Sequence, residues 1–427
     1  MADKFQIDHL VDHLFRHESG KLVSVLTRIF GVENIVLAED VVQDSLIEAM
    51  NQWQYKGIPV NPSAWLFRVA KNKALNILNR EKYKKKYSSD VSQYLQSERT
   101  SESALNQLFS EQEIQDDQLR MIFTCCHPAI SPDSQIALSL KTLCGFSIPE
   151  ISKAFLTTEE NINKRLIRAR QKIREARIPF EVPVGKDLHK RLQTVLETIY
   201  LLFNEGYSAS KGNEIIRYEL CEEAIRLAEI IISHPVVQNK SNVYALLALM
   251  QLNASRFRAR QDTDGNILTL EQQDRSLWNY SLMEKGFSSL EKSTSGELIS
   301  AYHILATVSA YYCSAANYNS TDWQSILALY DKLLQIDNSP IVLLNRAIVL
   351  SKVLGAEKAI KELEQIKNTS SLKSYYLFYS TQAALYIELN QFRKAIPILE
   401  TAIELAPLQT EKSLLQKKLE LCREKIS

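Results

Sequence analysis

Apolar residues recur at helical spacing along most of this chain, and the clearest example lies in residues 36–53. One face of this segment is apolar and is formed by Ala38, Val42, Leu46, Ala49 and Trp53. Another face is polar and mostly acidic, and carries Asp40, Gln43, Asp44 and Glu48. This spacing predicts an amphipathic helix. Its acidic face suits a basic protein partner better than DNA, although such a face can also simply be solvated.

Residues 64–81 predict a second amphipathic helix, which follows a turn at residues 57–62. Ser63 is placed to cap it. The inward positions are apolar, namely Leu66, Ala70, Ala74 and Ile77. The outward positions, Arg68, Asn72, Asn76 and Asn79, can donate to phosphates and base edges. Trp65 and Phe67 can stack on unpaired bases, or they can pack in the core.

Residues 145–170 predict a helix-turn-helix. The first helix would bury Ile148, Ile151, Ala154 and Phe155, and Thr158 would cap the second. The buried stripe of the second helix would be Ile162, Leu166, Ala169 and Ile173. Its other faces carry Asn161, Asn163, Lys164, Arg165 and Arg168. Such a helix can enter a major groove, where it reads bases and neutralises phosphates. Two acids at its start, Glu159 and Glu160, would repel phosphate unless they cap the helix or accept from cytosine.

Two breaks divide the chain. Residues 87–115 are rich in Ser, Gln and Glu and predict a flexible linker. Two prolines and a glycine within residues 178–185 predict an extended connector. The predicted domains are therefore residues 1–86, residues 116–180 and a helical extension over residues 187–427.

The extension contains a weak internal repeat. Tetratricopeptide spacing is followed by Tyr379, Ala383, Tyr386, Ala395, Leu399, Ala402 and Pro407. Part of the pattern occurs earlier, at Ala347, Leu350, Ala359 and Leu363. A tetratricopeptide-like extension is predicted, with a generic helical bundle as the alternative.

Composition agrees with helices. The 427 residues include only 11 glycines and 11 prolines, too few for turn-rich β architectures. The net charge is only +1, yet basic residues gather in segments 64–86 and 161–177. Two basic helical segments indicate two contacts with a polyanion.

Other chemistry is not indicated by the sequence. The six cysteines lack CxxC spacing, so we expect buried structural thiols and no metal site. Because no phosphate loop or nucleophile–base set is apparent, we expect no catalytic residue, no cofactor and no enzyme activity. No apolar run approaches the roughly 18 residues that span a bilayer, and residues 1–13 carry no leader pattern. We therefore expect a cytoplasmic protein that does not contact a membrane.

Several motifs resemble one family. DVVQDS at 40–45, NPSAWLFRVAKNKALNILNR at 61–80 and the helix-turn-helix ending in KRLIRARQKIREA are similar to regions 2 and 4 of extracytoplasmic-function (ECF) sigma factors, members of the sigma-70 family. The stretches that begin TCCHPAISP, LLFNEGYSAS and DGNILTLEQQDRSLWN resemble the subgroup with a long C-terminal helical-repeat extension.

The resemblance implies an alternative sigma factor that binds core RNA polymerase and directs promoter-specific initiation. It implies that core polymerase is bound by the acidic face with Asp40, Gln43, Asp44 and Glu48. The −10 element would be contacted by Trp65, Arg68, Lys71, Asn72 and Asn76. The −35 element would be read by Asn161, Asn163, Lys164, Arg165 and Arg168. The extension would regulate activity, through a contact within the chain or with a regulatory protein.

Two other classes stay open from the residues alone. A stand-alone helix-turn-helix regulator with a repeat-type sensor explains the helix-turn-helix but not the motifs at 40–45 and 61–80. A tetratricopeptide scaffold explains neither the helix-turn-helix nor the motifs at 40–45 and 61–80. The loop-like segments 203–210 and 262–279 are either helix-joining turns with packed Tyr207 and Trp278 or a docking surface.

Overall fold

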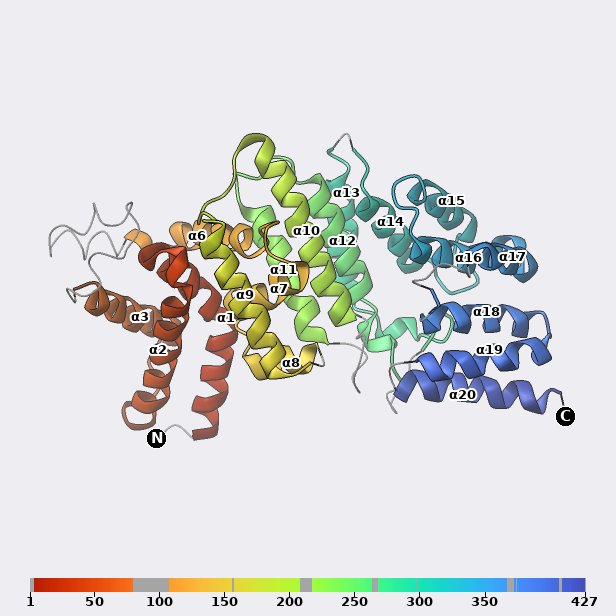
Figure 1. The fold of residues 1–427 in the computed structure, drawn as a ribbon, viewed down its shortest axis with the longest axis horizontal. Helices are drawn as coiled ribbons and strands as arrows, with labels where there is room; N and C mark the ends of the chain where they lie inside the picture. Colours follow the sequence, from red (N-terminus) through yellow and green to blue (C-terminus); the bar gives the residue numbers. More distant parts are fainter. Residues whose placement is uncertain are drawn as a thin grey trace. The chain divides into compact units, whose positions relative to one another are not determined.

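The computed structural model describes residues 4–79, 107–155, 157–207, 217–262, 268–296, 298–366, 372–373, 375–406 and 409–426. Helices dominate these residues, which contain no β-strand (Figure 1). The all-α prediction is confirmed. Packing divides the chain into unit 1, Met1–Leu202 with Glu229–Val236, and unit 2, Phe203–Ala228 with Val237–Ser427.

Unit 1 holds both segments that were expected to bind nucleic acid. Its helices are α1 (Lys4–Phe30), the short η1 (Val32–Asn34), α2 (Ile35–Lys56), α3 (Pro62–Asn79), α6 (Glu111–Cys125), α7 (Pro132–Thr142), α8 (Ile148–Ala154), α9 (Glu159–Glu175) and most of α10 (Gly185–Tyr207). The last residues of α11 (Tyr218–Ser233) also belong to it. The predicted linker 87–115 lies outside the described residues up to residue 106, and α6 already begins within its last part.

The predicted stripe of α2 forms part of the core of unit 1. All five of its apolar residues are at most 5% exposed. In α3, Leu66, Ala70 and Ala74 are fully buried, whereas Ile77 is half-buried. The prediction that Ser63 caps α3 is wrong. Because Pro62 takes the first helical position, Asn61 becomes the cap, and its Oδ1 accepts the Ala64 N–H at 2.9 Å.

The helix-turn-helix has the predicted form in α8 and α9. Thr158 caps α9, where its Oγ1 accepts the Asn161 N–H at 3.2 Å. The predicted stripe of α9 is buried at all four positions. In α8, Ile151 is buried, and Ile148 is half-buried.

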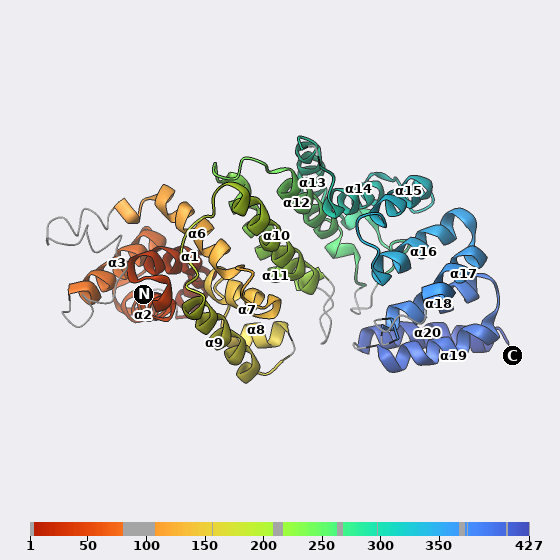
Figure 2. The same cartoon turned by 45° about the horizontal axis from the view of Figure 1, so that its top comes forward.

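Unit 2 is a succession of helices in which sequence neighbours pack together (Figure 2). It holds the first part of α11, α12 (Ser241–Ala254), η2 (Phe257–Ala259), η3 (Arg275–Leu277), α13 (Tyr280–Ser293), α14 (Ala301–Ser314), α15 (Trp323–Leu333), α16 (Pro340–Leu354), α17 (Ala356–Ile366), α18 (Tyr376–Glu388), α19 (Phe392–Leu405) and α20 (Gln409–Glu424). Gly286 lies in the middle of α13, where an added Cβ would lie 2.7 Å from Leu252 Cγ. The glycine therefore allows α13 to pack closely on α12.

The repeat positions pack as a helical hairpin. Ala383 of α18 and Ala395, Leu399 and Ala402 of α19 are fully buried in one apolar cluster. Pro407 lies outside the described residues. The tetratricopeptide assignment itself stays a prediction.

All six cysteines are free and buried, as predicted. Burial raises the pKa of the Cys126 thiol to about 11, which is the state of a packed rather than a reactive thiol. Within the described residues, no helix combines the length and apolar character needed to cross a membrane.

Candidate nucleic-acid and protein interfaces

The acidic face of α2 is accessible. Asp40, Gln43 and Asp44 are exposed beside the buried stripe. Glu48, in contrast, is half-buried, and its Oε2 lies 2.9 Å from Lys73 Nζ on α3. Glu48 thus also joins α2 to α3, and the assignment of all four residues to polymerase binding stays a prediction.

The polar face of α3 is accessible too. Arg68, Asn72 and Asn76 are exposed on one side of the helix, and Lys71 is half-buried. Trp65 is half-buried and meets the buried Trp53 edge-on, with 5.3 Å between ring centroids. The basic residues at positions 80–86 lie outside the described residues.

The exposed face of α9 is basic and amide-rich. Asn161, Asn163, Lys164 and Arg168 are exposed, whereas Arg165 is half-buried. Lys164 Nζ lies 2.8 Å from Glu160 Oε1, so one of the two leading acids pairs with a base of the same helix. Arg165 Nη2 lies 3.1 Å from Asp133 Oδ2 at the start of α7. Surface ion pairs of this kind contribute little to stability.

A second side of α9 contacts α2. Arg170 Nη2 lies 2.5 Å from Glu39 Oε2, and both side chains are largely buried. Burial raises the pKa of Glu39, while the charge of Arg170 acts in the opposite direction. The sequence patterns did not indicate this pair, because nothing in a local pattern relates residues 131 positions apart.

Helix α1 also packs directly on the helix-turn-helix region. Gly20 of α1 lies against the backbone of Leu143, just after α7, so closely that an added Cβ would be 2.1 Å from the carbonyl oxygen. The segments assigned to the two DNA elements therefore belong to one packed body within unit 1.

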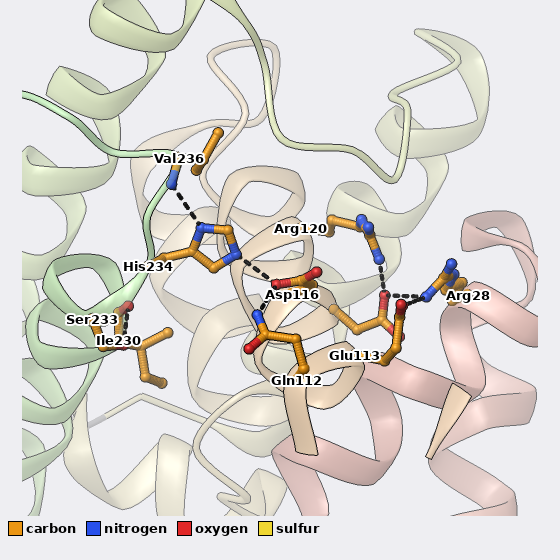
Figure 3. A network of polar contacts seen from close by, with 10 residues as sticks. Arg28, Gln112, Glu113, Asp116, Arg120, Ile230, Ser233, His234 and Val236 are labelled. Atoms are coloured by element: carbon orange, nitrogen blue, oxygen red, sulfur yellow. Dashed lines mark hydrogen bonds and ion pairs between the residues drawn. The ribbon is translucent and has the colours of Figure 1, made fainter. Parts of the chain in front are cut away.

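Helix α6 carries polar contacts with α1 and with the end of α11 (Figure 3). Arg28 of α1 forms ion pairs with Glu113 and Asp117. On another side of α6, Asp116 Oδ1 lies 2.7 Å from Nε2 of His234, just after α11. Together these contacts connect α1, α6 and the end of α11.

Polar contacts join helix α10 to α6 and α7. Arg191 Nη2 donates to the Phe123 carbonyl oxygen at 2.5 Å, and its guanidinium lies over the Phe123 ring. Thr198 Oγ1 donates to Gln135 Oε1 at 2.8 Å. Gln135 Nε2 in turn donates to the carbonyl oxygens of His127 and Ile130. The TCCHPAI segment therefore has a packing role, and no cluster able to hold a metal occurs among the residues the structure describes.

The chain is similar to known protein families over three of its segments. Residues 14–83 match sigma-70 region 2, residues 120–173 match sigma-70 region 4, and residues 191–294 match a family of unknown function, DUF6596. An uncharacterized protein of Rhizobium meliloti is 33% identical over 93% of this chain and 92% of its own length. No solved structure matches significantly. The two sigma-70 regions lie in the order and on the helices that the sequence predicted, so the chain belongs to the sigma-70 family as an ECF-like sigma factor with a C-terminal DUF6596 extension.

Proposed function

We propose that this sigma factor, whose two sigma-70 regions serve promoter-directed transcription, uses three separate faces of unit 1. Core RNA polymerase is bound by the α2 face with Asp40, Gln43, Asp44 and Glu48, and Glu48 also pairs with Lys73 of α3. The −10 element is contacted by the α3 face with Trp65, Arg68, Lys71, Asn72 and Asn76. The −35 element is read by the α9 face with Asn161, Asn163, Lys164, Arg165 and Arg168.

One observation carries this proposal. On each of the three helices, a buried apolar stripe fixes the helix in unit 1 while charged and amide side chains remain exposed on another side. The exposed side of α2 is acidic, whereas the exposed sides of α3 and α9 carry basic and amide side chains. This division of charge fits one protein partner and two contacts with DNA.

We further propose that the C-terminal extension regulates the sigma domains through α10 and α11. The contacts of Arg191, Thr198 and His234 with α6 and the region around α7 support this proposal, because a change in the extension would reach region 4 through them. Coupling of this kind requires that the contacts favour one arrangement of the sigma domains over another.

A point variant tests the regulatory proposal without touching any predicted polymerase or DNA contact. His234→Ala removes the hydrogen bond to Asp116, and His189→Ala is the matched control because His189 is exposed on α10. With purified core polymerase and one promoter, we expect His234→Ala to change transcript yield at least about twofold, the range of a weak coupling energy. Yields equal to wild type in both variants would contradict coupling through this contact.

A further inference from the structure

Three arginines of unit 2 gather around aromatic rings. The guanidinium carbon of Arg260 lies 3.9 Å from the ring centroid of Tyr207, and that of Arg275 lies 4.4 Å from the ring of Trp278. The guanidinium carbon of Arg256 lies 6.0 Å from the Trp278 ring and 5.9 Å from the Tyr312 ring. We call these residues the arginine–aromatic cluster: Tyr207, Arg256, Arg260, Arg275, Trp278 and Tyr312.

The cluster unites the two loop-like segments for which the sequence left two interpretations open. Tyr207 comes from segment 203–210, and Arg275 and Trp278 come from segment 262–279. Trp278 is 4% exposed, as expected for a packed residue. The rings of Tyr207 and Trp278 are therefore packed, as one interpretation expected. Their packing also brings Arg256, Arg260 and Arg275 close together, so these segments can still bind a ligand.

The partners of these arginines are neutral. Arg256 donates to Tyr207 Oη at 3.1 Å and to Asn253 Oδ1 at 2.7 Å. Arg260 donates to the Tyr207 carbonyl oxygen at 2.6 Å, and Arg275 donates to two carbonyl oxygens, those of Tyr312 and Ala315. In the described part of the chain, none of the three arginines forms an ion pair with a carboxylate. Three positive charges thus lie together, and no carboxylate among the described residues pairs with any of them.

Four hydrogen-bonding atoms of these turns are buried and have no partner among the residues that the structure describes. They are Nε of Arg256, Nη2 of Arg275 and Nε1 of Trp278, with Oε1 of Gln273 beside them in sequence. Arg256 is only 7% exposed. Burial lowers the pKa of Arg275, and the charge of Arg256 lowers it further. Buried donors without acceptors and charges without counter-charges both cost free energy, and one bound anion would relieve both.

We propose that the arginine–aromatic cluster is a binding site for a small oxyanion, a phosphate or carboxylate group held by Arg256, Arg275 and the Trp278 indole N–H. Guanidinium groups match such oxyanions with paired hydrogen bonds. The depth of Arg256 and Trp278 favours a small molecule over an acidic protein segment. The site lies in the extension and does not depend on the proposed polymerase and promoter contacts.

Thermal unfolding of the full chain tests the proposal. Sodium phosphate and sodium succinate are titrated separately against sodium chloride of equal ionic strength, so that the two arms distinguish a phosphate from a carboxylate site. We expect one of the two anions to raise the unfolding midpoint saturably, by about 2–4 °C at millimolar concentration. Arg275→Gln should abolish the shift. Arg258→Gln should keep it, because Arg258 is exposed on the same turn and outside the cluster.

Three results would overturn the proposal. One is the absence of a saturable shift with either anion. Another is a shift that rises linearly without saturation in all variants, which is general salt exclusion from the protein surface. The third is a saturable shift that Arg275→Gln and Arg256→Gln both retain, since binding would then lie elsewhere. If Arg275→Gln unfolds without any anion, Arg275→Lys decides the outcome, because it keeps the charge but loses the paired donors of the guanidinium. An undiminished shift in that variant would overturn the proposal.

Discussion

Arg170 on α9 and Glu39 on α2 form an ion pair whose side chains are 19% and 12% exposed. The pair joins sigma-70 region 4 to region 2 in the isolated chain. The predicted −35 face and the predicted polymerase face lie on other sides of the same two helices. An arrangement that separates region 2 from region 4 would have to break the Arg170–Glu39 pair.

The ion pair should be energetically coupled. Glu39→Gln and Arg170→Gln each leave a largely buried group without its partner, and we expect each to lower the free energy of unfolding by about 1–3 kcal/mol. The double variant should lose clearly less than the sum of the two. Urea unfolding of the four proteins gives the coupling energy, and a value near zero would show that the pair contributes nothing.

Gly20 should be required for the contact between α1 and the helix-turn-helix region. A methyl group there would lie 2.1 Å from the Leu143 carbonyl oxygen, and neither backbone can yield without separation of the elements. For Gly20→Ala we expect a longer and broader distance distribution between spin labels at Asn72 and Arg168, which are both exposed. A distribution identical to that of the unsubstituted chain would refute close packing at this position.

Helices α2, α3, α8 and α9 of unit 1 were predictable, but their mutual packing was not. The stripe from Ala38 to Trp53 and the cap at Thr158 follow from local spacing, and both are confirmed. The contact of Glu39 with Arg170 depends on tertiary structure, and no local pattern carries it. The prediction for Ser63 failed because Pro62 moved the cap by two residues.

In unit 2, helices were predicted throughout, but the close packing of α13 on α12 was not. It depends on Gly286, which disfavours a helix locally but allows the two helices to approach. The candidate binding faces could be located because exposure follows helical spacing. The arginine–aromatic cluster could not be found, because its charges come from separate turns that only the fold brings together.

Asp44 should contribute to polymerase binding. It is exposed on α2, whereas Glu48 already pairs with Lys73, so charge reversal at Asp44 tests the surface without disturbing α3. We expect Asp44→Arg to weaken core polymerase binding about tenfold or more, as for a like-charge contact in an interface. Glu197→Arg, an equal change at an exposed acid of α10, is the control. If both variants bind core polymerase equally well, Asp44 lies outside the interface.

Asp117 should make stability depend on pH. Burial raises its pKa to about 7, although the charges of Arg28 and Arg120 oppose the shift. Between about pH 4 and pH 7 the folded chain then keeps a proton that the unfolded chain has lost. The free energy of unfolding should therefore fall as pH rises through this range, by on the order of 2–4 kcal/mol, and level off above it.

Asp117→Asn should remove this part of the pH dependence, because the amide does not titrate. Urea unfolding at intervals from pH 4.5 to pH 8 compares the two proteins. Parallel curves for the variant and the unsubstituted chain would show that Asp117 is ionised throughout, held by its two arginines.

Transcription in vitro tests the central claim most directly. The full chain is added to purified core RNA polymerase on promoters selected by genomic binding, with core polymerase alone as the reference. We predict transcripts that start at defined sites only when the chain is present, and that are lost with Arg168→Ala or Asn72→Ala. The absence of chain-dependent initiation from every selected promoter would contradict the account.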